Sequence, residues 1–328
     1  MKNLKLAVVL VLLSVLVFGG CQGSSDDKDA GTKSAESKLK VAMVLPGLKT
    51  DEAFNQFTYE GMMRAAEDLD IETAFVEEVK QDEQIEVIRQ FAQQGYDIII
   101  GQGGQFGEAL QTVAKEYPDQ EFVFSVATDT GGVPNLTAVT VSYSHAGYIA
   151  GIMAGQMTKN NKVAMILGEW YTPHRQMWES FQKGVAASGK DVEVKSVATG
   201  SWSDVNKARE ASLALIADGV DVLLPVLDAA YVGVLSAAQD SDDVLVVGSV
   251  LDMAKVAPEV VVGSVVYNWN ELGYQEATGE ITDGGTHILG IKENGITPVL
   301  NDLLSDEGKT AVEDAIAGLK AGNIDILP

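Results

Sequence analysis

Two short stretches of this chain, KVAMVL at residues 40–45 and KVAMIL at residues 162–167, begin with the same four residues and continue as apolar runs. A strand that is covered on both faces of a parallel sheet is apolar along its whole length, whereas a half-exposed strand alternates between apolar and polar residues. Each stretch therefore predicts a buried parallel strand. Their similarity predicts one structural design that the chain uses twice.

Similar strands recur around both stretches. The first set comprises residues 40–47, 72–79, 96–103, 121–129 and 136–143, and the second comprises residues 161–168, 191–200, 220–228, 244–250 and 260–266. Helix-like stretches separate the runs, and in one of them, residues 203–219, we expect Ser203 to cap the helix and Gly219 to follow its end. Buried strands that alternate with amphipathic helices indicate parallel sheets. The sequence thus predicts an α/β fold with two Rossmann-like lobes.

The predicted lobes place a ligand cleft between them. Residues 39–144 and about 268–328 are expected to form the first lobe, including the C-terminal stretch 286–304, and residues 145–267 the second. In open parallel sheets, ligands bind outside the carboxyl ends of the strands. Aromatic and acidic residues are frequent in the segments that follow the predicted strands, namely residues 46–54, 101–106, 127–132, 168–174, 199–204, 227–231, 249–253 and 267–271. These segments are the predicted walls of the cleft.

The N-terminus has the pattern of an export signal. Lys2 and Lys5 precede an apolar run over residues 6–18, which predicts a signal peptide at residues 1–20. Cys21 follows two glycines, so VFGGC resembles a bacterial lipobox and predicts lipidation of the Cys21 sulfur; the alternative is a signal-peptide cysteine without a role. Residues 21–38 then form the lipidated cysteine and a flexible linker, because residues 22–38 hold no apolar residue larger than alanine.

Charge excludes one class of partner. The formal net charge is −24, and removal of residues 1–20, which hold two lysines and no acid, makes it more negative by two. A field of that sign repels phosphate backbones and anionic lipid surfaces. We therefore expect no nucleic-acid partner, and contact with a membrane only through the lipid anchor.

The sequence contains no recognisable catalytic set. GQGGQFG at residues 101–107 does not match the dinucleotide-binding glycine pattern, and no phosphate-binding lysine follows it. The three histidines, at 145, 174 and 287, lack metal-ligand spacing, and Cys21 is the only cysteine. We expect a protein that is not an enzyme and has no metal or cofactor. The alternative is an enzyme that acts on nucleosides.

Three segments carry a family resemblance: LPG with TDEAFNQFTYEG at residues 45–61, GQGGQFGEAL at residues 101–110, and SHAGYIAGIMAGQMTKNNKVAMILG at residues 144–168. Together they resemble the basic-membrane-protein family of substrate-binding lipoproteins, which serve ABC importers and include the purine nucleoside receptors. The resemblance covers residues 40 to 325. It implies a periplasmic-binding-protein-like fold of type I, a bilobal receptor that closes on a small molecule.

The resemblance also implies ligand contacts. Asp51, Phe54 and Asn55 match a family motif, Tyr59 matches an aromatic that stacks on the base in relatives, and Trp202 stands at the position of the opposing aromatic. Two facing rings sandwich a planar heterocycle, each stack contributing roughly 1–3 kcal/mol. The alternatives are that Asp51 or Asn55 caps the following helix, and that the two aromatics pack the lobes together.

Two departures from the family pattern favour a free base. Val250 stands where nucleoside receptors have a ribose-binding aspartate, and Tyr267 stands where they have a lysine. An unpaired ribose hydroxyl would cost on the order of 1–3 kcal/mol. Asp228 is a suitable acceptor for an exocyclic amine or a ring N–H. We therefore expect an adenine-like purine base rather than a nucleoside.

The expected ligand contacts are Thr50, Asp51, Phe54, Asn55, Tyr59, Gly103, Gln105, Trp170, Trp202, Asp228, Asp252 and Trp269. Asp252 and Trp269 are alternatively hinge residues, and Trp170, Tyr171 and His174 either line the cleft or form a rim that faces the importer. The expected protein is a monomeric, extracytoplasmic, lipid-anchored receptor that delivers a purine base to an ABC permease. The alternatives are a purine nucleoside receptor, a sugar or autoinducer receptor, and a signalling lipoprotein.

Overall fold

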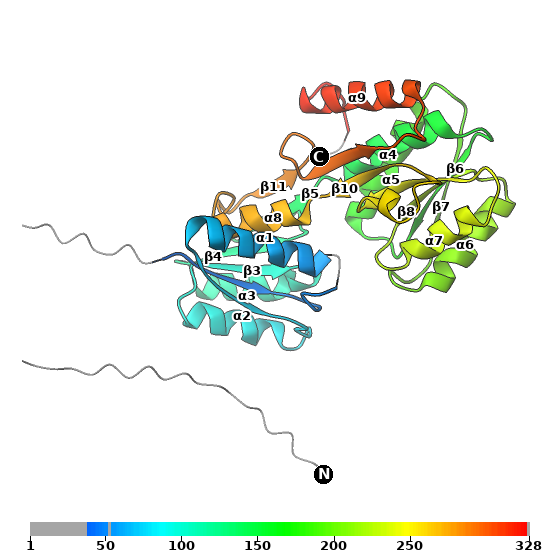
Figure 1. Ribbon diagram of the computed structural model, residues 1–328. Helices are drawn as coiled ribbons and strands as arrows, with labels where there is room; N and C mark the ends of the chain where they lie inside the picture. The colour runs from blue at the N-terminus through cyan, green and yellow to red at the C-terminus, as the bar shows by residue number, and fades with distance from the viewer. Residues whose placement is uncertain (1–37, 52–53, 327–328) are drawn as a thin grey trace, which may run out of the picture. The chain divides into compact units, whose positions relative to one another are not determined.

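A computed structural model describes residues 38–51 and 54–326, all within one unit, Lys38–Pro328 (Figure 1). The predicted signal peptide, Cys21 and the linker up to residue 37 lie outside the described residues. Among the helices of the described part, none is long and apolar enough to cross a membrane.

The first lobe is built on a fully parallel sheet with the strand order β11-β5-β4-β3-β1-β2. Its strands are β1 (Lys40–Val44), β2 (Glu72–Val76), β3 (Ile98–Gln102), β4 (Glu121–Ser125), β5 (Leu136–Val141) and β11 (Thr286–Leu289). Helices α1 (Phe54–Leu69) and α8 (Trp269–Thr278) pack against each other on one face of the sheet. Helices α2 (Gln84–Gln93) and α3 (Gly107–Glu116), the latter preceded by the short helix η1 (Gly104–Phe106), cover the other face (Figure 1).

The second lobe repeats this arrangement with the strand order β12-β10-β9-β8-β6-β7. Its strands are β6 (Lys162–Leu167), β7 (Glu193–Ala198), β8 (Val222–Val226), β9 (Leu245–Val250), β10 (Val261–Tyr267) and β12 (Ile296–Leu300). Helices α4 (Tyr143–Met157) and α5 (Thr172–Ala186) pack on one face, with α9 (Asp306–Lys320) against α4. Helices α6 (Val205–Ala217) and α7 (Tyr231–Gln239) pack on the other face, and the short helix η2 (Met253–Lys255) follows β9.

The prediction of one design used twice is confirmed. The order 2-1-3-4-5 of the first sheet corresponds to the order 7-6-8-9-10 of the second, so β1 and β6 hold equivalent positions. These are the strands formed by the two KVAM stretches, and all but their first residue is buried in each. Equivalent strands of the two sheets therefore have their carboxyl ends at equivalent places, and the segments that follow these ends form the site described below.

The chain passes between the sheets at three places: after β5, after β10, and between β11 and β12. Two backbone hydrogen bonds join these crossings, from the Ser142 N–H to the Leu289 carbonyl and from the Asn268 N–H to the Gly295 carbonyl, each 2.9 Å long. The crossing segments are thus fastened to one another where they leave the lobes.

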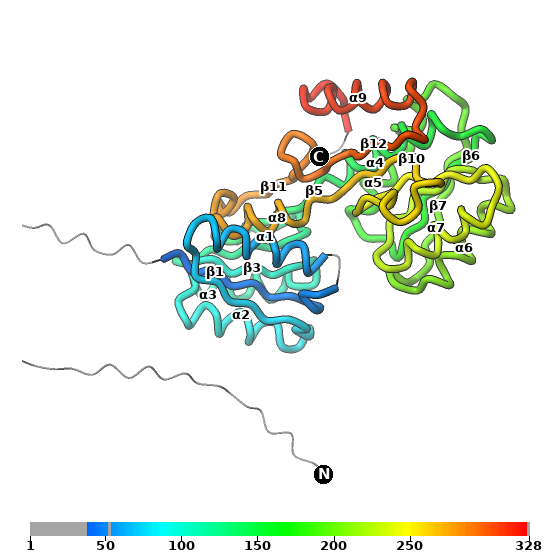
Figure 2. Tube along the Cα trace, viewed as in Figure 1, coloured from blue at the N-terminus to red at the C-terminus, as the bar shows by residue number. Residues whose placement is uncertain are grey.

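The predicted boundary of the lobes is wrong near the C-terminus. Strand β11 returns to the first sheet as expected, but β12 pairs antiparallel with β10 in the second sheet, where the two run side by side (Figure 2). Helix α9 also packs on the second lobe. Pro298, within β12, is tolerated because β12 is an edge strand, whose unpaired side needs no N–H donor.

The cap of α6 also differs from the prediction. The Asp204 carboxylate, rather than Ser203, accepts hydrogen bonds from the backbone N–H groups of Asn206 and Lys207, each 3.1 Å long. Gly219 follows the end of this helix with a positive φ of 92°, as a residue after a helix end commonly does.

Glycines allow α4 and α5 to pack with their backbones in close contact. A Cβ atom on Gly151 would lie 2.2 Å from the Phe181 carbonyl oxygen, and one on Gly184 would lie 2.1 Å from the Tyr148 carbonyl oxygen. Neither helix can accept a side chain at this contact unless the two helices move apart.

We expect Gly151→Ala to lower the free energy of unfolding by about 1–3 kcal/mol, the usual cost of overfilling a packed core. Urea unfolding would measure the change. The control is Gly104→Ala, at an exposed glycine whose Cβ would meet only the Val126 carbonyl oxygen, at 3.9 Å. This control should change stability by less than about 0.5 kcal/mol. Equal stability of Gly151→Ala and the wild type would contradict the packing argument.

Candidate functional site

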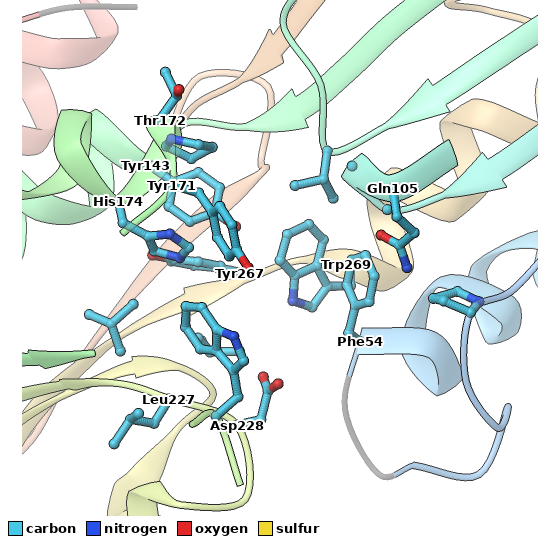
Figure 3. A pocket seen from close by; sticks show the side chains of 18 residues that line it. Phe54, Gln105, Tyr143, Tyr171, Thr172, His174, Leu227, Asp228, Tyr267 and Trp269 are labelled. Atoms are coloured by element: carbon cyan, nitrogen blue, oxygen red, sulfur yellow. The ribbon is translucent and has the colours of Figure 1, made fainter. Parts of the chain in front are cut away.

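A pocket of about 750 Å³ is lined by residues from both lobes and from the crossings between them (Figure 3). The first lobe supplies Pro46, Phe54, Gly103, Gly104, Gln105 and Val126. The second supplies Tyr171, Thr172, Pro173, His174, Trp202, Val226, Leu227, Asp228 and Val250, and the crossings supply Tyr143, Tyr267 and Trp269. Most of these residues follow the carboxyl end of a strand, where parallel sheets bind ligands.

Aromatic rings form one continuous series along this pocket. It starts in the first lobe with Phe54, whose ring lies edge-to-face with that of Trp269, 5.1 Å between centroids at an angle of 83°. Trp269 is followed by Tyr267 at 5.7 Å and then by Tyr143 at 5.3 Å, both again edge-to-face. Such pairs contribute about 0.5–1.5 kcal/mol each beyond the burial of their area. The series therefore gives the crossings a rigid aromatic wall.

The series continues into the second lobe. The His174 ring lies 5.5 Å from that of Tyr143 and 5.0 Å from that of Trp202. Trp202 in turn is nearly parallel to Tyr171, with centroids 6.2 Å apart and an angle of 15° between planes. Gly168 makes room for Trp202, because a Cβ there would lie 2.3 Å from the indole. The second lobe thus presents flat aromatic surfaces to the pocket.

Two titratable side chains define the charge of the pocket. Asp228 is open to the water of the pocket, yet the surrounding protein removes part of its solvation, and this burial, together with the negative charge of Asp51, raises its pKa. His174 is buried, its Nδ1 has no hydrogen-bond partner, and burial lowers its pKa to about 4. The imidazole is therefore neutral at physiological pH. In Figure 3 the Asp228 carboxylate points into the space between His174 and Phe54.

Two valines line the pocket in a left-handed backbone conformation. Val126 follows β4 with a φ of 59°, and Val250 ends β9 with a φ of 71°. β-Branched residues rarely adopt positive φ, and each such residue costs about 1–3 kcal/mol. Strands β4 and β9 are equivalent in the two sheets, so the same turn is made twice, once on each side of the pocket.

Half of the ligand contacts expected from the sequence lie on the pocket. These are Phe54, Gly103, Gln105, Trp202, Asp228 and Trp269. Tyr171 and His174, for which a place in the cleft or on a rim was left open, line the pocket as well. The other six expected residues lie elsewhere.

Asp51 and Asn55 form the start of α1. The Asp51 carboxylate accepts hydrogen bonds from the backbone N–H groups of Asn55 and Gln56, at 3.1 and 3.0 Å, and from the Asn55 side-chain amide at 2.7 Å. Asp51 therefore caps the helix, the alternative that the sequence left open. Thr50, just before it, is exposed.

Three further expected contacts are not on this pocket. The Tyr59 ring packs edge-to-face on Phe75 at 4.9 Å, with the Lys49 ammonium 4.9 Å from its centroid, so this structure does not bring Tyr59 and Trp202 together across the pocket. Trp170 lies 6.4 Å from the ring of Trp178. Asp252 caps η2 and borders a second pocket, of about 530 Å³.

Sequence reasoning missed Tyr143 and Val126 and gave no ligand role to Val250 and Tyr267. Three of them stand at or directly after the end of a strand and Tyr143 stands two residues after one, so that position alone could have identified them. Among residues 38–51 and 54–326, no group of three or more histidine, cysteine, aspartate or glutamate side chains is placed to hold a metal ion.

Comparison with known proteins finds relatives along nearly the whole chain. A purine-binding protein of Brucella abortus is 27% identical over 90% of this chain and 84% of its own length. The ABC transporter nucleoside-binding protein BmpA of Lactococcus lactis is 25% identical over 99% of this chain and 98% of its own. The transcriptional activator protein Med of Bacillus subtilis is 26% identical over 90% and 91%.

Solved structures share the fold. A solute-binding protein of an ABC transporter system from Aeropyrum pernix superposes with a TM-score of 0.75 at 20% identity, covering 88% of this chain and 93% of its own. A transcriptional activator of the comK gene from Bacillus halodurans gives a TM-score of 0.74 at 23% identity, covering 86% and 97%. The predicted two-lobed, periplasmic-binding-protein-like fold is confirmed.

A family model described as "ABC transporter substrate-binding protein PnrA-like" matches residues 38–317, which is most of the chain. The description is that of a solute-binding receptor of ABC transporters rather than an enzyme. The chain therefore belongs to the Bmp family of PnrA-like ABC transporter substrate-binding proteins.

Proposed function

We propose that this protein is an extracytoplasmic receptor that binds a purine base, adenine or a close analogue, between its lobes and delivers it to an ABC permease. The observation that carries the proposal is the pocket itself, in which a continuous series of aromatic rings lines the same space as one carboxylate of the described residues, Asp228. Stacking on aromatic side chains contributes about 1–3 kcal/mol per base. The names of two relatives, a purine-binding and a nucleoside-binding protein, support the same ligand class.

The charge of the pocket restricts the ligand further. Among the described residues that line the pocket, Asp228 is the only acidic side chain and there is no lysine or arginine, and His174 is neutral. Asp51 adds negative charge nearby, since it raises the pKa of Asp228. A phosphorylated ligand would be repelled, whereas a neutral base with an exocyclic amine and ring N–H groups offers donors to the carboxylate. His174, as a neutral imidazole, can donate or accept.

Two residues favour a base over a nucleoside. Val250 presents an apolar side chain to the pocket, and the Tyr267 hydroxyl is buried next to the Met177 sulfur, 3.3 Å away. Neither would bond a ribose hydroxyl, and a buried hydroxyl without a partner costs on the order of 1–3 kcal/mol.

The N-terminal segment determines where the proposed receptor would be held. A signal peptide and lipidation of Cys21, both indicated by the sequence, would hold a monomer on the extracytoplasmic side of the bacterial cell membrane. Two of the similar proteins are named as transcriptional activators, which keeps a regulatory role as the second candidate. The net charge of −24 argues against contact with DNA in such a role.

The ligand class is tested by isothermal titration of the protein after unfolding and refolding to remove bound ligand, with adenine, guanine, adenosine, guanosine, AMP and ribose. We expect a purine base to bind at least about tenfold more tightly than its nucleoside, equivalent to about 1.4 kcal/mol. AMP and ribose should not bind. Preference for a nucleoside would overturn the base assignment, and no binding to any of the six compounds would overturn the purine assignment.

Trp202 should contribute stacking energy to binding. We expect Trp202→Ala to weaken adenine binding by about tenfold to a hundredfold, corresponding to the loss of one stack. The matched control is Tyr59→Ala, which removes an aromatic residue that lies outside the pocket and should leave the affinity unchanged. Equal effects of the two substitutions would show that Trp202 does not contact the ligand.

The neutral state of His174 makes stability depend on pH. Its pKa is about 4 in the folded protein against 6.5 when free, so the unfolded chain binds the extra proton between these values, and stability falls as pH falls below about 6.5. Between about pH 7 and pH 5, the wild type should lose about 1–2 kcal/mol more than His174→Gln, which has no titrating ring. Denaturant unfolding at both pH values measures this difference. Parallel losses in the two proteins would mean that His174 titrates normally.

A further inference from the structure

Four fully buried polar side chains lie beneath the pocket wall of the first lobe: Thr58 on α1, Gln102 on β3, Ser125 on β4 and Glu276 on α8. The Gln102 amide nitrogen donates to the Thr58 hydroxyl at 2.6 Å, and the Ser125 hydroxyl donates to Oε1 of Glu276. The side chains thus form two bonded pairs, and each pair links a strand to a helix.

One atom of each pair has no partner. Oε1 of Gln102 and Oε2 of Glu276 are both buried, and neither has a hydrogen-bond partner among the described residues. The loss of one hydrogen bond by a buried polar group costs about 1–3 kcal/mol, and more for a charged group. Two such atoms in one place therefore require a physical explanation.

The two atoms belong to neighbouring side chains. Gln102 and Ser125 are opposite each other in the register of β3 and β4, so their side chains stand side by side on the same face of the sheet. Glu276 is bonded to Ser125, and Gly273, one turn before it on α8, approaches so closely that its Cβ would lie 2.1 Å from the Thr58 carbonyl oxygen. The sheet, α1 and α8 thus enclose all four side chains.

A single proton satisfies both atoms. An ionised Glu276 and the Gln102 carbonyl are both acceptors and cannot bond to each other, whereas a protonated carboxyl has one O–H donor. We propose that Glu276 is a carboxylic acid in the folded protein, that its Oε2 donates the proton to Oε1 of Gln102, and that the resulting chain Thr58–Gln102–Glu276–Ser125 positions the first-lobe wall of the pocket.

The surroundings of Glu276 favour the neutral form. Complete burial raises its pKa to about 8, against an opposing contribution from the Ser125 hydroxyl. The side chains that face it from α1, β3 and β4 are uncharged. On the same elements, Arg64 and Glu271 pair with each other at the surface. Glu121 begins β4, at the end of the strand opposite to Ser125, the partner of Glu276. No described cation is therefore paired with this carboxyl.

Three members of the chain are next to a residue of the pocket wall, and the fourth shares a helix with one. Thr58 donates to the Phe54 carbonyl at 2.9 Å, Gln102 precedes Gly103, and Ser125 precedes Val126. Glu276 belongs to α8, which begins with Trp269. Loss of the Glu276 proton would leave a buried charge among these segments and disturb the wall. Glu276 is thus a positioning residue. Its expected effect on ligand affinity rests on the proposed function, whereas the proposal that its carboxyl is protonated is independent of that function.

The proton is observable directly by infrared spectroscopy of the intact protein. The wild type should show the C=O band of a protonated carboxyl at pH 7, the band should disappear with a midpoint near pH 8, and Glu276→Gln should lack it. The matched control is Glu271→Gln on the same helix, where the half-buried carboxyl pairs with Arg64, and this variant should keep the band. Absence of the band from the wild type at pH 7 would overturn the proposal, whether or not adenine binds.

Ligand affinity tests the positioning role. If only the protonated form binds, the wild-type affinity for adenine should fall about tenfold between pH 7 and pH 9, as the protonated fraction falls from about nine-tenths to about one-tenth. Glu276→Gln, whose amide can donate to Gln102 and accept from Ser125, should bind at pH 7 like the wild type and lose this dependence. The same pH profile in the wild type and in Glu276→Gln would overturn the positioning role. Failure of adenine to bind would instead overturn the proposed function and leave the infrared result to decide the protonation.

Discussion

The pocket depends on the place where the chain passes between its two sheets. Three segments make this passage, and hydrogen bonds from Ser142 to Leu289 and from Asn268 to Gly295 fasten them together. Tyr143, Tyr267 and Trp269 stand directly beside these bonds, so the joint between the lobes and the back wall of the pocket are the same structure. In bilobal proteins a few residues at such crossings absorb the change in backbone angles when the lobes close. Here closure would act directly on residues that line the ligand space.

The sequence was sufficient to predict the architecture because the strands of both sheets are nearly continuous apolar runs, and such runs indicate strands buried on both faces. It was insufficient for β12, since a short edge strand needs no such pattern and either sheet could have accepted it. The site was predicted in part. Phe54 and Tyr59 are five residues apart on α1, which is a rotation of roughly 140° at 3.6 residues per turn, so both cannot face the same ligand. A motif shows which residues are close in the chain, whereas the direction of a helical side chain depends on how the helix packs.

Several unfavourable features are concentrated around the pocket. Val126 and Val250 hold left-handed conformations, the buried His174 has no partner for its Nδ1 among the described residues, and Glu276 is a fully buried carboxyl whose pKa is raised by burial. Each of these features lowers the stability of the folded chain, and none would be expected if this region served only to pack the fold. Because these residues lie at equivalent strand ends and beneath the pocket wall, we infer that the stability is lost for the sake of ligand binding. Dense packing elsewhere in the fold offsets this loss of stability, for example between α4 and α5, where glycines bring the helix backbones together.

Edge strand β12 has a consequence for behaviour at high concentration. An exposed sheet edge offers unpaired backbone groups to a second molecule, and proteins suppress such pairing with prolines and charges. Pro298 removes one donor from β12, and the opposite edge of the same sheet, β7, carries Glu193 and Lys195. Both ends of this sheet therefore resist edge-to-edge association. Molecules of this protein at high local concentration could thus collide often without assembling into fibres.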